Sequence, residues 1–486
     1  MRRLYRKERP PGWLLHLVFL FGVSGGWVSA APNILVLFAD DYCHEVLHAM
    51  GDPVVQTPNL DRLVARGTVF THAYNMGSWA PAVCIASRTM LMTGRSLWDA
   101  RRIYSRLESE REAGQLWPQL LGAAGYRTFM SGKWHLPVDA ARAFSDVAHI
   151  RPGMPKDVPQ GYLRPVQGHI DPWDPTDRNL GGYWEGGKHW SEVTADDVVD
   201  YLARTGTDQR PFFVYCAFNA PHDPRQAPRE YLERYGVEQM TLPVNFLPAY
   251  PYAKVMEAGP DLRDERLAPY PRTEFAVRTH RREYYALISH LDAQIGRVLD
   301  ALEASGRSAD TWVFFTADHG LAVGQHGLMG KQNMHEHSLR VPFIVAGPGV
   351  AANRRIETRI YLQDVMPTTL ELAGVSRPSQ VWYRSVLPLM GESGPGEQPD
   401  IYSAYRESQR ALIHDSFKLI VYPAGKVLRL YQLDKDPAET TDLAMDEAYV
   451  SKTRELFALL LQQQRLLGDP IALQAAFPEW SNDGKN

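Results

Sequence analysis

Residues 33–41 read N-I-L-V-L-F-A-D-D, an unbroken apolar run that ends in two adjacent carboxylates. A strand without alternating polar residues is typical of a parallel sheet that is covered on both faces. Similar runs occur at residues 211–218, 311–317 and 341–346, and segments with helical periodicity separate them. Strands that alternate with helices predict an α/β fold, with a large, mostly parallel sheet sandwiched between helices.

The clearest helical pattern spans residues 283–305, where apolar residues recur at helical spacing and Gly306 follows. From about residue 399 the pattern changes to short strands and one helix, which predicts a small C-terminal α+β subdomain. The other predicted helices are 59–66, 116–124, 195–204 and 363–373, and the predicted C-terminal elements are strands at 400–405, 410–421 and 427–433 and a helix at 449–466.

The first 30 residues have a basic start, an apolar run at residues 13–23 and small residues before Ala31. This order is typical of a secretory signal peptide, and the apolar run is shorter than the roughly 20 residues that a bilayer span needs. We therefore expect an exported protein, periplasmic or secreted, without a stable membrane span once residues 1–30 are removed. The predicted division is a signal peptide at 1–30, a large α/β domain at 31–395 and the C-terminal subdomain at 396–486.

Charge and cysteine content exclude some classes of protein. Lys and Arg number 52 against 56 Asp and Glu, and no basic block follows residue 30, which argues against nucleic acid binding. Three cysteines allow at most one disulfide, so disulfides are not the framework of the fold. If Cys84 has another role, Cys43 and Cys216 are either a pair or two buried thiols.

Two pairs of candidate ligands follow predicted strands. Asp40 and Asp41 come directly after the first strand, and Asp318 and His319 come directly after the run at 311–317. The carboxyl ends of parallel strands lie at one edge of a sheet, where ligands bind. Adjacent carboxylates repel one another unless a cation lies between them, and oxygen ligands suit Ca²⁺ or Mg²⁺. The pattern predicts one metal site; the alternative is a solvated loop in which Asp caps a turn.

A third stretch, residues 81–95, reads P-A-V-C-I-A-S-R-T-M-L-M-T-G-R. Good helix formers follow Cys84 without an internal Gly or Pro, and Gly94 suits a helix end. This predicts a helix with Cys84 near its N-terminus, where free N–H groups stabilise a thiolate or a bound sulfate. Arg88 lies one turn further along the same face. The alternative is a structural Cys beside a surface Arg.

This stretch, with Cys84, Ser87, Arg88 and T-G-R at 93–95, resembles the signature of the type I sulfatases of the alkaline-phosphatase-like superfamily. The resemblance implies that a maturase oxidises Cys84 to formylglycine (3-oxoalanine), which becomes the nucleophile. The common family pattern is C-x-P-S-R, whereas this chain has Ala86 in place of Pro. The aerobic maturase is expected to prefer Pro and the radical-type maturases tolerate Ala, so the conversion route stays open.

Further motifs extend the resemblance from residue 33 to about residue 443. G-K-W-H at 132–135 is similar to the family motif whose Lys and His, here Lys133 and His135, contact sulfate and formylglycine. P-H-D-P at 221–224 is similar to the family's P-H-x-P, whose His binds the sulfate or its bridging oxygen. The resemblance implies the same role for His222. Lys331 matches the family's second sulfate-binding Lys.

The resemblance also implies the metal and the roles of the side chains. A divalent cation, Ca²⁺ rather than Mg²⁺, would be held by Asp40, Asp41, Asp318, His319 and residue 84. Arg88 would help to ionise the nucleophile, and Lys133, His222 and Lys331 would neutralise sulfate. His222 or Lys331 would protonate the leaving alcohol, and His135 would accept the proton that releases sulfate. The expected reaction is hydrolysis of a sulfate ester.

The substrate is predicted only by class, a sulfated small molecule or oligosaccharide. The aromatic residues of a Trp- and Tyr-rich loop at 162–190 either stack against sugar rings or pack the loop against the protein. Arg178, Lys188 and His189 in this loop could bind further sulfates or carboxylates. We expect a carbohydrate sulfate. The alternatives are an aryl or choline sulfate, a phosphonate or phosphodiester substrate on the same fold, and a non-catalytic module that binds sulfated glycans.

Overall fold

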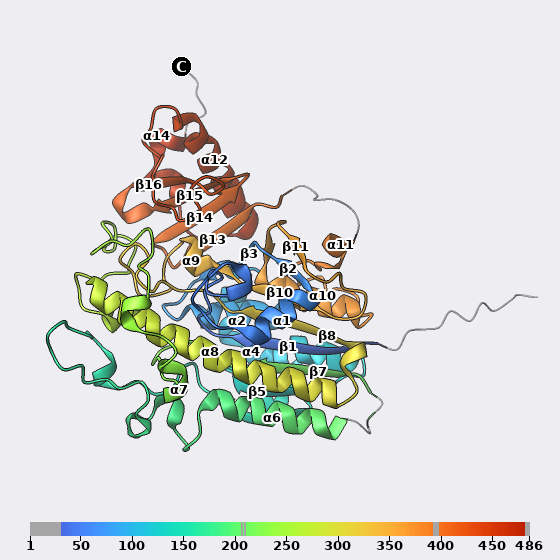
Figure 1. Cartoon of the computed structure of the whole chain (residues 1–486). Helices are drawn as coiled ribbons and strands as arrows, with labels where there is room; N and C mark the ends of the chain where they lie inside the picture. The colour runs from blue at the N-terminus through green and yellow to red at the C-terminus, as the bar shows by residue number, and fades with distance from the viewer. Residues whose placement is uncertain (1–30, 206–207, 209, 392–397, 482–486) are drawn as a thin grey trace, which may run out of the picture. The chain divides into compact units, whose positions relative to one another are not determined.

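The computed structural model describes residues 31–205, 208, 210–391 and 398–481 (Figure 1). From Pro32 onward the chain forms one compact unit. The predicted signal peptide at 1–30 and the predicted domain boundary at 395–396 lie outside the described residues. In the described part of the chain, no helix has both the length and the apolar character that a bilayer crossing needs.

An eight-stranded sheet forms the centre of the large domain, with strand order β11-β2-β10-β8-β1-β7-β5-β6. The central strands β8, β1, β7, β5 and β6 are parallel, and Ile34 of β1 lies between Phe213 of β7 and Trp312 of β8. The predicted mostly parallel sheet is therefore confirmed. The strands are β1 (Asn33–Ala39), β2 (Thr68–Phe70), β5 (Arg127–Lys133), β6 (Asp146–Arg151), β7 (Phe212–Ala217), β8 (Thr311–Ala317), β10 (Phe343–Ala346) and β11 (Arg354–Ile356).

The apolar run at 341–346 differs from a single parallel strand. It is divided at Pro342, which cannot donate a ladder hydrogen bond. The first part belongs to β9 (Arg340–Val341) in a three-stranded sheet with β3 (Ala73–Tyr74) and β12 (Ile360–Tyr361). The second part, β10, is antiparallel to both β8 and β2.

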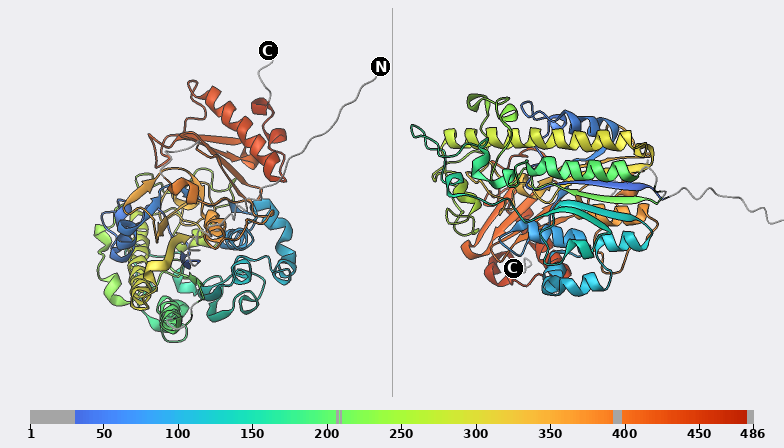
Figure 2. Two further views of the ribbon diagram at one scale, coloured as in Figure 1. Left: turned by 90° about the vertical axis from the view of Figure 1, so that its right-hand side faces the viewer. Right: turned by 90° about the horizontal axis from the view of Figure 1, so that it is seen from below.

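Helices cover both faces of the large sheet. α1, α6 and α8 lie on one face, and α2, α5 and α10 lie on the other (Figures 1 and 2). The helices of the large domain are α1 (Pro58–Arg66), α2 (Val83–Thr93), α3 (Leu97–Ile103), α4 (Leu107–Glu112), α5 (Trp117–Ala123), α6 (Trp190–Thr205), α7 (Arg229–Leu232), α8 (Glu274–Ala304), α9 (Glu336–Leu339), α10 (Val365–Leu372) and α11 (Leu387–Met390).

α8 begins nine residues before the predicted start at residue 283. Its first turns contain charged residues that hide the apolar periodicity, yet several of them are buried, among them His280, Arg281 and Glu283. The N-cap Thr273, whose side chain accepts a hydrogen bond from Ala276 N, marks the true start. The capping residue Thr273 is therefore the feature of the sequence from which the start of α8 could have been predicted.

A five-stranded sheet, with order β16-β15-β14-β13-β4, forms the C-terminal subdomain with α12 (Figure 1). The predicted strand at 410–421 is two strands, because Asp415 turns the chain with a positive φ of 49°. The edge strand β4 comes from far upstream and pairs in parallel with β13. The elements are β4 (Gly77–Ser78), β13 (Ile401–Tyr405), β14 (Gln409–His414), β15 (Phe417–Tyr422), β16 (Val427–Gln432), α12 (Val450–Leu467), α13 (Leu473–Ala476) and α14 (Pro478–Ser481).

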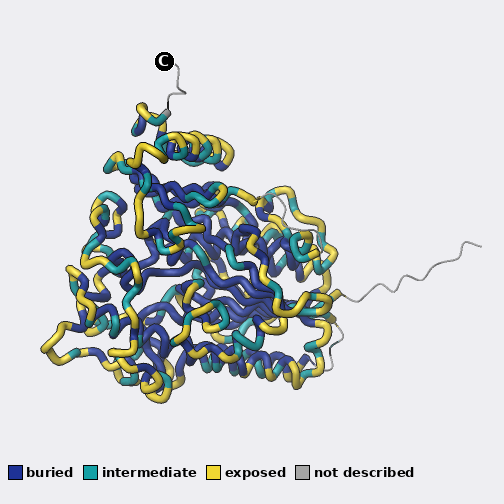
Figure 3. The backbone as a smooth tube through the Cα atoms, turned by 45° about the horizontal axis from the view of Figure 1, so that its top comes forward, coloured by how far each residue is buried: buried dark blue, intermediate teal, exposed yellow. Residues whose placement is uncertain are grey.

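Burial follows the sheets (Figure 3). Every residue of β1 and β7 is buried, as expected for strands covered on both faces. Cys43, Cys84 and Cys216 are buried free thiols, so the pair considered for Cys43 and Cys216 is not formed in the described part of the chain.

Candidate active site

The predicted site residues come together at the carboxyl ends of adjacent parallel strands. Asp40 follows β1, Asp318 follows β8, Lys133 ends β5, and His222 lies beyond the end of β7. Backbone bonds continue past the strands, because Asp40 N donates to Ala220 O (3.2 Å) and Asp318 N donates to Ala39 O (3.2 Å). The sheet therefore fixes the positions of these side chains relative to one another.

Cys84 lies in the first turn of α2, which Ala82 precedes and Gly94 ends in the left-handed conformation. Its Sγ is 3.2 Å from His135 Nδ1. Burial opposes ionisation, but Lys133 and the hydrogen bond with His135 lower the pKa of the Cys84 thiol well below its usual value. The predicted helix and the predicted place of Cys84 at its start are confirmed.

Arg88 lies one turn further along α2 and is almost fully buried. Its Nε donates to Asp318 Oδ2 (3.0 Å), and its Nη1 donates to Lys133 O (3.0 Å) and to the Tyr215 hydroxyl (3.2 Å). Burial opposes the charge, but Tyr215, Asp318 and Asp40 hold the pKa of Arg88 above its usual value. Nη2 has no hydrogen-bond partner among the described residues and lies 3.9 Å from Asp40 Oδ1, so one donor remains for a ligand.

Four side chains could share a cation: Asp40, Cys84, Asp318 and His319 each place a ligand atom within 4.8 Å of the others. Asp40 Oδ1 and His319 Nε2 are buried and have no hydrogen-bond partner within the described residues. Burial and the neighbouring Asp318 raise the pKa of Asp40 well above its usual range. Unsatisfied acceptors and crowded carboxylates are what a divalent cation would relieve, so these residues fit one.

Asp41 is not a member of this group of four, although its Oδ1 lies 3.3 Å from His319 Nδ1. Lys331 Nζ donates to both of its carboxylate oxygens (2.8 and 3.0 Å), and His222 Nε2 is 3.8 Å from Asp41 Oδ2. Asp41 therefore groups with His222 and Asp223 rather than with Asp40. Its backbone still faces the first group, because Asp41 N donates to Asp318 Oδ1 (3.3 Å).

Both lysines form buried ion pairs, Lys133 with Asp40 and Lys331 with Asp41. Burial opposes the charge of Lys331, but Asp41 and other acids hold its pKa above the usual range. His222 Nδ1 is 2.7 Å from the carbonyl oxygen of Asp223, so this nitrogen carries the proton and Nε2 faces Asp41. The charges of both lysines thus act on the Cys84 side chain, and the His222 ring faces Asp41, the acid that Lys331 binds.

Two site residues have an unusual backbone. Asp41 (φ 66°) and His135 (φ 59°) are in the left-handed region, which costs free energy in residues with a Cβ. Gly153 makes room for the His135 ring, because a Cβ at residue 153 would lie 2.3–2.7 Å from three ring atoms. The motifs did not identify Gly153, which lies 18 positions downstream and outside them.

The chain matches a family model. The model described as Sulfatase covers residues 32–375, and the model described as N-sulphoglucosamine sulphohydrolase, C-terminal, covers residues 324–465. The chain belongs to the sulfatase family. It is therefore a sulfuric ester hydrolase of type I in the alkaline-phosphatase-like superfamily, and the resemblance noted from the motifs is confirmed.

Known sulfatases and related structures are similar over most of their length. The choline-sulfatase of Rhizobium meliloti (strain 1021) is 29% identical over 460 residues, which are 88% of this chain and 87% of that protein. A protein solved in complex with its substrate D-glucosamine-2-N,6-O-disulfate has a TM-score of 0.69 and 22% identity, over 92% of this chain and 99% of that one. The phosphonate monoester hydrolase of Agrobacterium radiobacter has a TM-score of 0.68 and 20% identity, over 90% of this chain and 96% of that one.

The aromatic loop of this sulfatase is not an open platform. Trp173, Tyr183, Trp184 and Trp190 are at most 5% exposed, and Tyr183 stacks on the buried His189 at 4.7 Å. Of the two alternatives considered for these aromatics, their burial favours packing of the loop over stacking against sugar rings. Arg178 and Lys188 are exposed, but Arg178 lies over Trp184 and Lys188 pairs with Asp196.

Two half-buried aromatics lie nearer to Cys84 in the sequence. Trp79 lies five residues upstream and contacts Tyr104 edge to face, with ring centroids 5.8 Å apart. Sequence patterns gave these two residues no role, because isolated aromatics between strands and helices carry no periodic signal.

Proposed function

We propose that this sulfatase hydrolyses a sulfate ester on a carbohydrate, using a formylglycine made from Cys84 and one Ca²⁺ ion. The observation that carries the proposal is the position of Cys84: it lies at the start of α2, 3.2 Å from His135 Nδ1, among Lys133, Arg88 and the carboxylates. A residue that is converted to a nucleophile needs this kind of cationic, anion-stabilising surrounding.

Asp40, Asp318 and His319 would hold the cation, with Asp41 beside them, and the bound ion would supply positive charge that favours an ionised nucleophile. Hydrated formylglycine would supply one hydroxyl that attacks sulfur and a second that allows the sulfate to be released. A serine at this position would have only the first hydroxyl. The free Nη2 of Arg88 is the donor available to orient the attacking oxygen.

Lys133, Lys331 and His222 would bind the sulfate oxygens, where charge accumulates in the transition state. Because His222 Nδ1 donates to Asp223 O, its Nε2 has no proton to give while the ring is neutral. Burial lowers the pKa of His222, although Asp41 opposes this effect. We therefore favour Lys331 as the proton donor to the leaving alcohol and His222 as a group that positions it.

His135 would act in the second half of the reaction. Its Nδ1 already lies at hydrogen-bond distance from the side-chain atom of residue 84. From there it can accept the proton of the second hydroxyl while sulfate leaves. The left-handed backbone of His135 and the space at Gly153 hold the ring in this position.

The carbohydrate class is supported by two comparisons. The C-terminal part matches the model named for N-sulphoglucosamine sulphohydrolase, and a structural neighbour was solved with a glucosamine disulfate as its substrate. Hydrolysis of a phosphonate monoester is a second candidate, because the Agrobacterium hydrolase has nearly the same TM-score as that neighbour. We also propose export to the periplasm or medium, with residues 1–30 as the signal peptide.

The first experiment is expression of the full chain with a radical-type or an aerobic maturase. Mass spectrometry of the peptide that contains Cys84 is expected to show the aldehyde, and sulfate release is expected from glucosamine 6-sulfate. Choline sulfate, 4-nitrophenyl sulfate and a phosphonate monoester are the comparison substrates. An unchanged thiol with both maturases contradicts the mechanism, and a higher kcat/KM for the phosphonate contradicts the carbohydrate sulfate.

For export, the N-terminal residue of the protein recovered from the periplasm or medium is the measurement. A start near Ala31 is expected. Retention of residues 1–30 on protein found only inside the cell contradicts the proposed signal peptide.

A further inference from the structure

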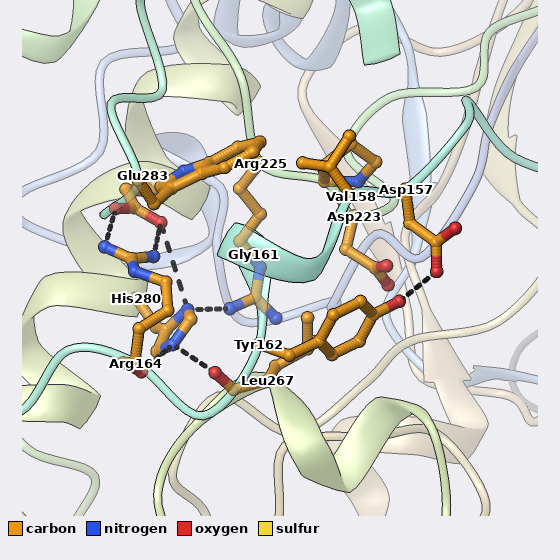
Figure 4. A pocket seen from close by; sticks show the side chains of 12 residues that line it. Asp157, Val158, Gly161, Tyr162, Arg164, Asp223, Arg225, Leu267, His280 and Glu283 are labelled. Carbon is orange, nitrogen blue, oxygen red and sulfur yellow. Dashed lines mark hydrogen bonds and ion pairs between the residues drawn. The ribbon is translucent and has the colours of Figure 1, made fainter. Parts of the chain in front are cut away.

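Figure 4 shows a pocket whose lining includes Asp223, the residue whose carbonyl oxygen accepts from His222 Nδ1. It is lined by Tyr162 and Trp173 from the aromatic loop, by Asp223 and Arg225 just after His222, and by Arg164 and Glu283. Arg225 reaches between the Glu283–Arg164 pair and the ring of Tyr162 (Figure 4). Apart from the carbonyl oxygen of Asp223, which fixes the proton on His222, the residues that line the pocket have no role in the chemistry proposed above.

One edge of the Arg225 guanidinium is left without partners. Its Nη1 is 3.0 Å from His280 Nδ1, while Nε and Nη2 have no hydrogen-bond partner in the part of the chain that the structure describes. Arg225 is 3% exposed, so water does not compensate these donors from the surface. Nε and Nη2 form the edge of an arginine that donates two parallel hydrogen bonds to a carboxylate or a sulfate.

The neighbouring histidine cannot neutralise this charge. His280 Nε2 lies 2.8 Å from Arg164 O and 3.2 Å from Leu267 O, so it carries the proton and donates to these carbonyls. Its Nδ1 is therefore a bare acceptor for Arg225. Burial and the cations Arg164 and Arg225 lower the pKa of His280 well below its usual value, which agrees with a neutral ring.

The acids that line the pocket are already bound to other groups. Glu283 accepts from Arg164 Nη1 (2.8 Å) and Nη2 (2.6 Å), Asp223 is bound by Arg263, and Asp157 accepts from the Tyr162 hydroxyl. Among the residues that the structure describes, no carboxylate is therefore hydrogen-bonded to Arg225. A buried guanidinium with two unsatisfied donors costs free energy that an incoming oxyanion would recover.

The pocket has an outer side. Asp157 is exposed, and Val158 and Gly161 are half-buried, whereas Arg225 lies at the inner end. Since neither free nitrogen is reached by solvent, binding of an oxyanion requires the pocket to widen. Arg225 is three residues after His222, so the pocket adjoins the side of the site where the leaving alcohol would be held.

We propose that Arg225 binds a second oxyanion of the substrate, a sulfate or a carboxylate carried by the sugar that bears the scissile sulfate ester. This inference rests on the proposed carbohydrate sulfatase activity and narrows it to polyanionic sugars. Arg225 is then a specificity-determining residue. A sugar with one sulfate would lack the partner for the Nε and Nη2 edge.

The test compares glucosamine 6-sulfate with D-glucosamine-2-N,6-O-disulfate on the mature enzyme and on Arg225→Gln and Arg225→Lys. The wild type is expected to prefer the disulfate, and both variants are expected to reduce that preference about 10- to 100-fold, mainly through KM. Val158→Trp, which fills the outer pocket and leaves Arg225 intact, is also expected to reduce the preference for the disulfate. Arg229→Gln, an exposed arginine of the same segment, is the matched control and is expected to change nothing.

Binding by the unmodified Cys84 protein separates this inference from the proposed function, because affinity for the two sugars can be titrated without turnover. Loss of the preference in the Arg225 variants supports the inference even if another ester proves to be the substrate. An equal effect on both sugars, or no effect, overturns it and leaves a structural role. It is also overturned if Arg225→Gln weakens binding of inorganic sulfate only, since the pocket then takes the free ion.

Discussion

At the scale of single residues, the motifs predicted which side chains meet but not what holds them. Asp40, Lys133, His222 and Asp318 could be placed because each follows a strand, and neighbouring parallel strands end at one edge. Supporting groups such as the Tyr215 hydroxyl on Arg88 carry no motif, because their roles arise only when distant strands pair. The roles assigned to the ten site residues stay predictions, although the structure brings them together.

Gly153→Ala is expected to move His135. The added Cβ would lie 2.3 Å from the His135 ring, so the ring must leave its place near residue 84. A displacement of this size lowers kcat by about 100-fold, with little change in KM. Steady-state kinetics on the mature enzyme measure the effect. Gly259→Ala, where a Cβ meets nothing within 4 Å, is the control, and equal losses in both variants would contradict the role of Gly153.

Cys84→Ser is expected to abolish turnover, with kcat about 10³-fold lower or more. The serine keeps the place at the start of α2 but lacks the second hydroxyl that would release sulfate in the proposed mechanism. Incubation with substrate and mass spectrometry of the intact protein is the measurement, and any product is expected to remain attached to Ser. Sustained sulfate release by this variant would show that formylglycine is not needed.

At the scale of elements, the strands were the most predictable features, and β1 and β8 have the predicted ends. Continuous apolar runs are unambiguous when both faces of a strand are buried. Predictions failed where polar residues are buried or where one residue changes direction. The charged first turns of α8 hid its start, Pro342 divided β9 from β10, and Asp415 divided β14 from β15.

The C-terminal sheet is tied to α9 by buried charges. Lys418 Nζ on β15 donates to Glu336 Oε1 (2.8 Å) and to Glu439 Oε1 (2.9 Å), and all three residues are at most 5% exposed. Lys418→Met would remove the cation that these two buried carboxylates share, which costs about 3–5 kcal/mol.

Unfolding in urea measures this loss of stability, which lowers the urea concentration at the midpoint of the Lys418→Met transition. Lys452→Met, which removes a partly exposed lysine paired with Glu455, serves as the control and should change stability by less than about 1 kcal/mol. If the Lys418 variant unfolds like this control, the buried network does not stabilise the sheet.

At the scale of the whole molecule, residues from Pro32 onward fold as one compact unit, so events at the site should appear in global stability. Ca²⁺ at about 100 times its Kd should stabilise the folded protein by about 2.7 kcal/mol. A higher thermal midpoint with Ca²⁺ that EGTA reverses is the expected result. In Asp40→Asn this response should be lost, and a response equal to that of the wild type would place the cation elsewhere.

Stability should also depend on pH through Glu265, which accepts from Met329 N (3.0 Å) and Gly330 N (3.0 Å) beside Lys331. Burial raises the pKa of Glu265 to about 7, despite the pairing with Arg272. Because folding favours the protonated form, its contribution is complete below the ordinary carboxyl pKa and is lost as the pH rises to about 7.

Glu265→Gln, which stays neutral, should therefore gain about 2 kcal/mol relative to the wild type between pH 5 and pH 7.5. Unfolding in urea at the two pH values measures the difference. If the free energies of unfolding of variant and wild type differ by the same amount at both pH values, Glu265 is charged throughout this range.

The parallel pairing of β4 with β13 has a consequence for the order of events during synthesis. Gly77 and Ser78, just before the start of α2, gain their sheet partners only when Ala404 and Tyr405 have been made. At about 5–20 residues per second, the ribosome needs on the order of half a minute to reach them. The proposed conversion of Cys84 would have to reach a thiol that is 2% exposed in the finished protein. The late closure of this sheet would give a modifying enzyme that interval to act on the nascent chain.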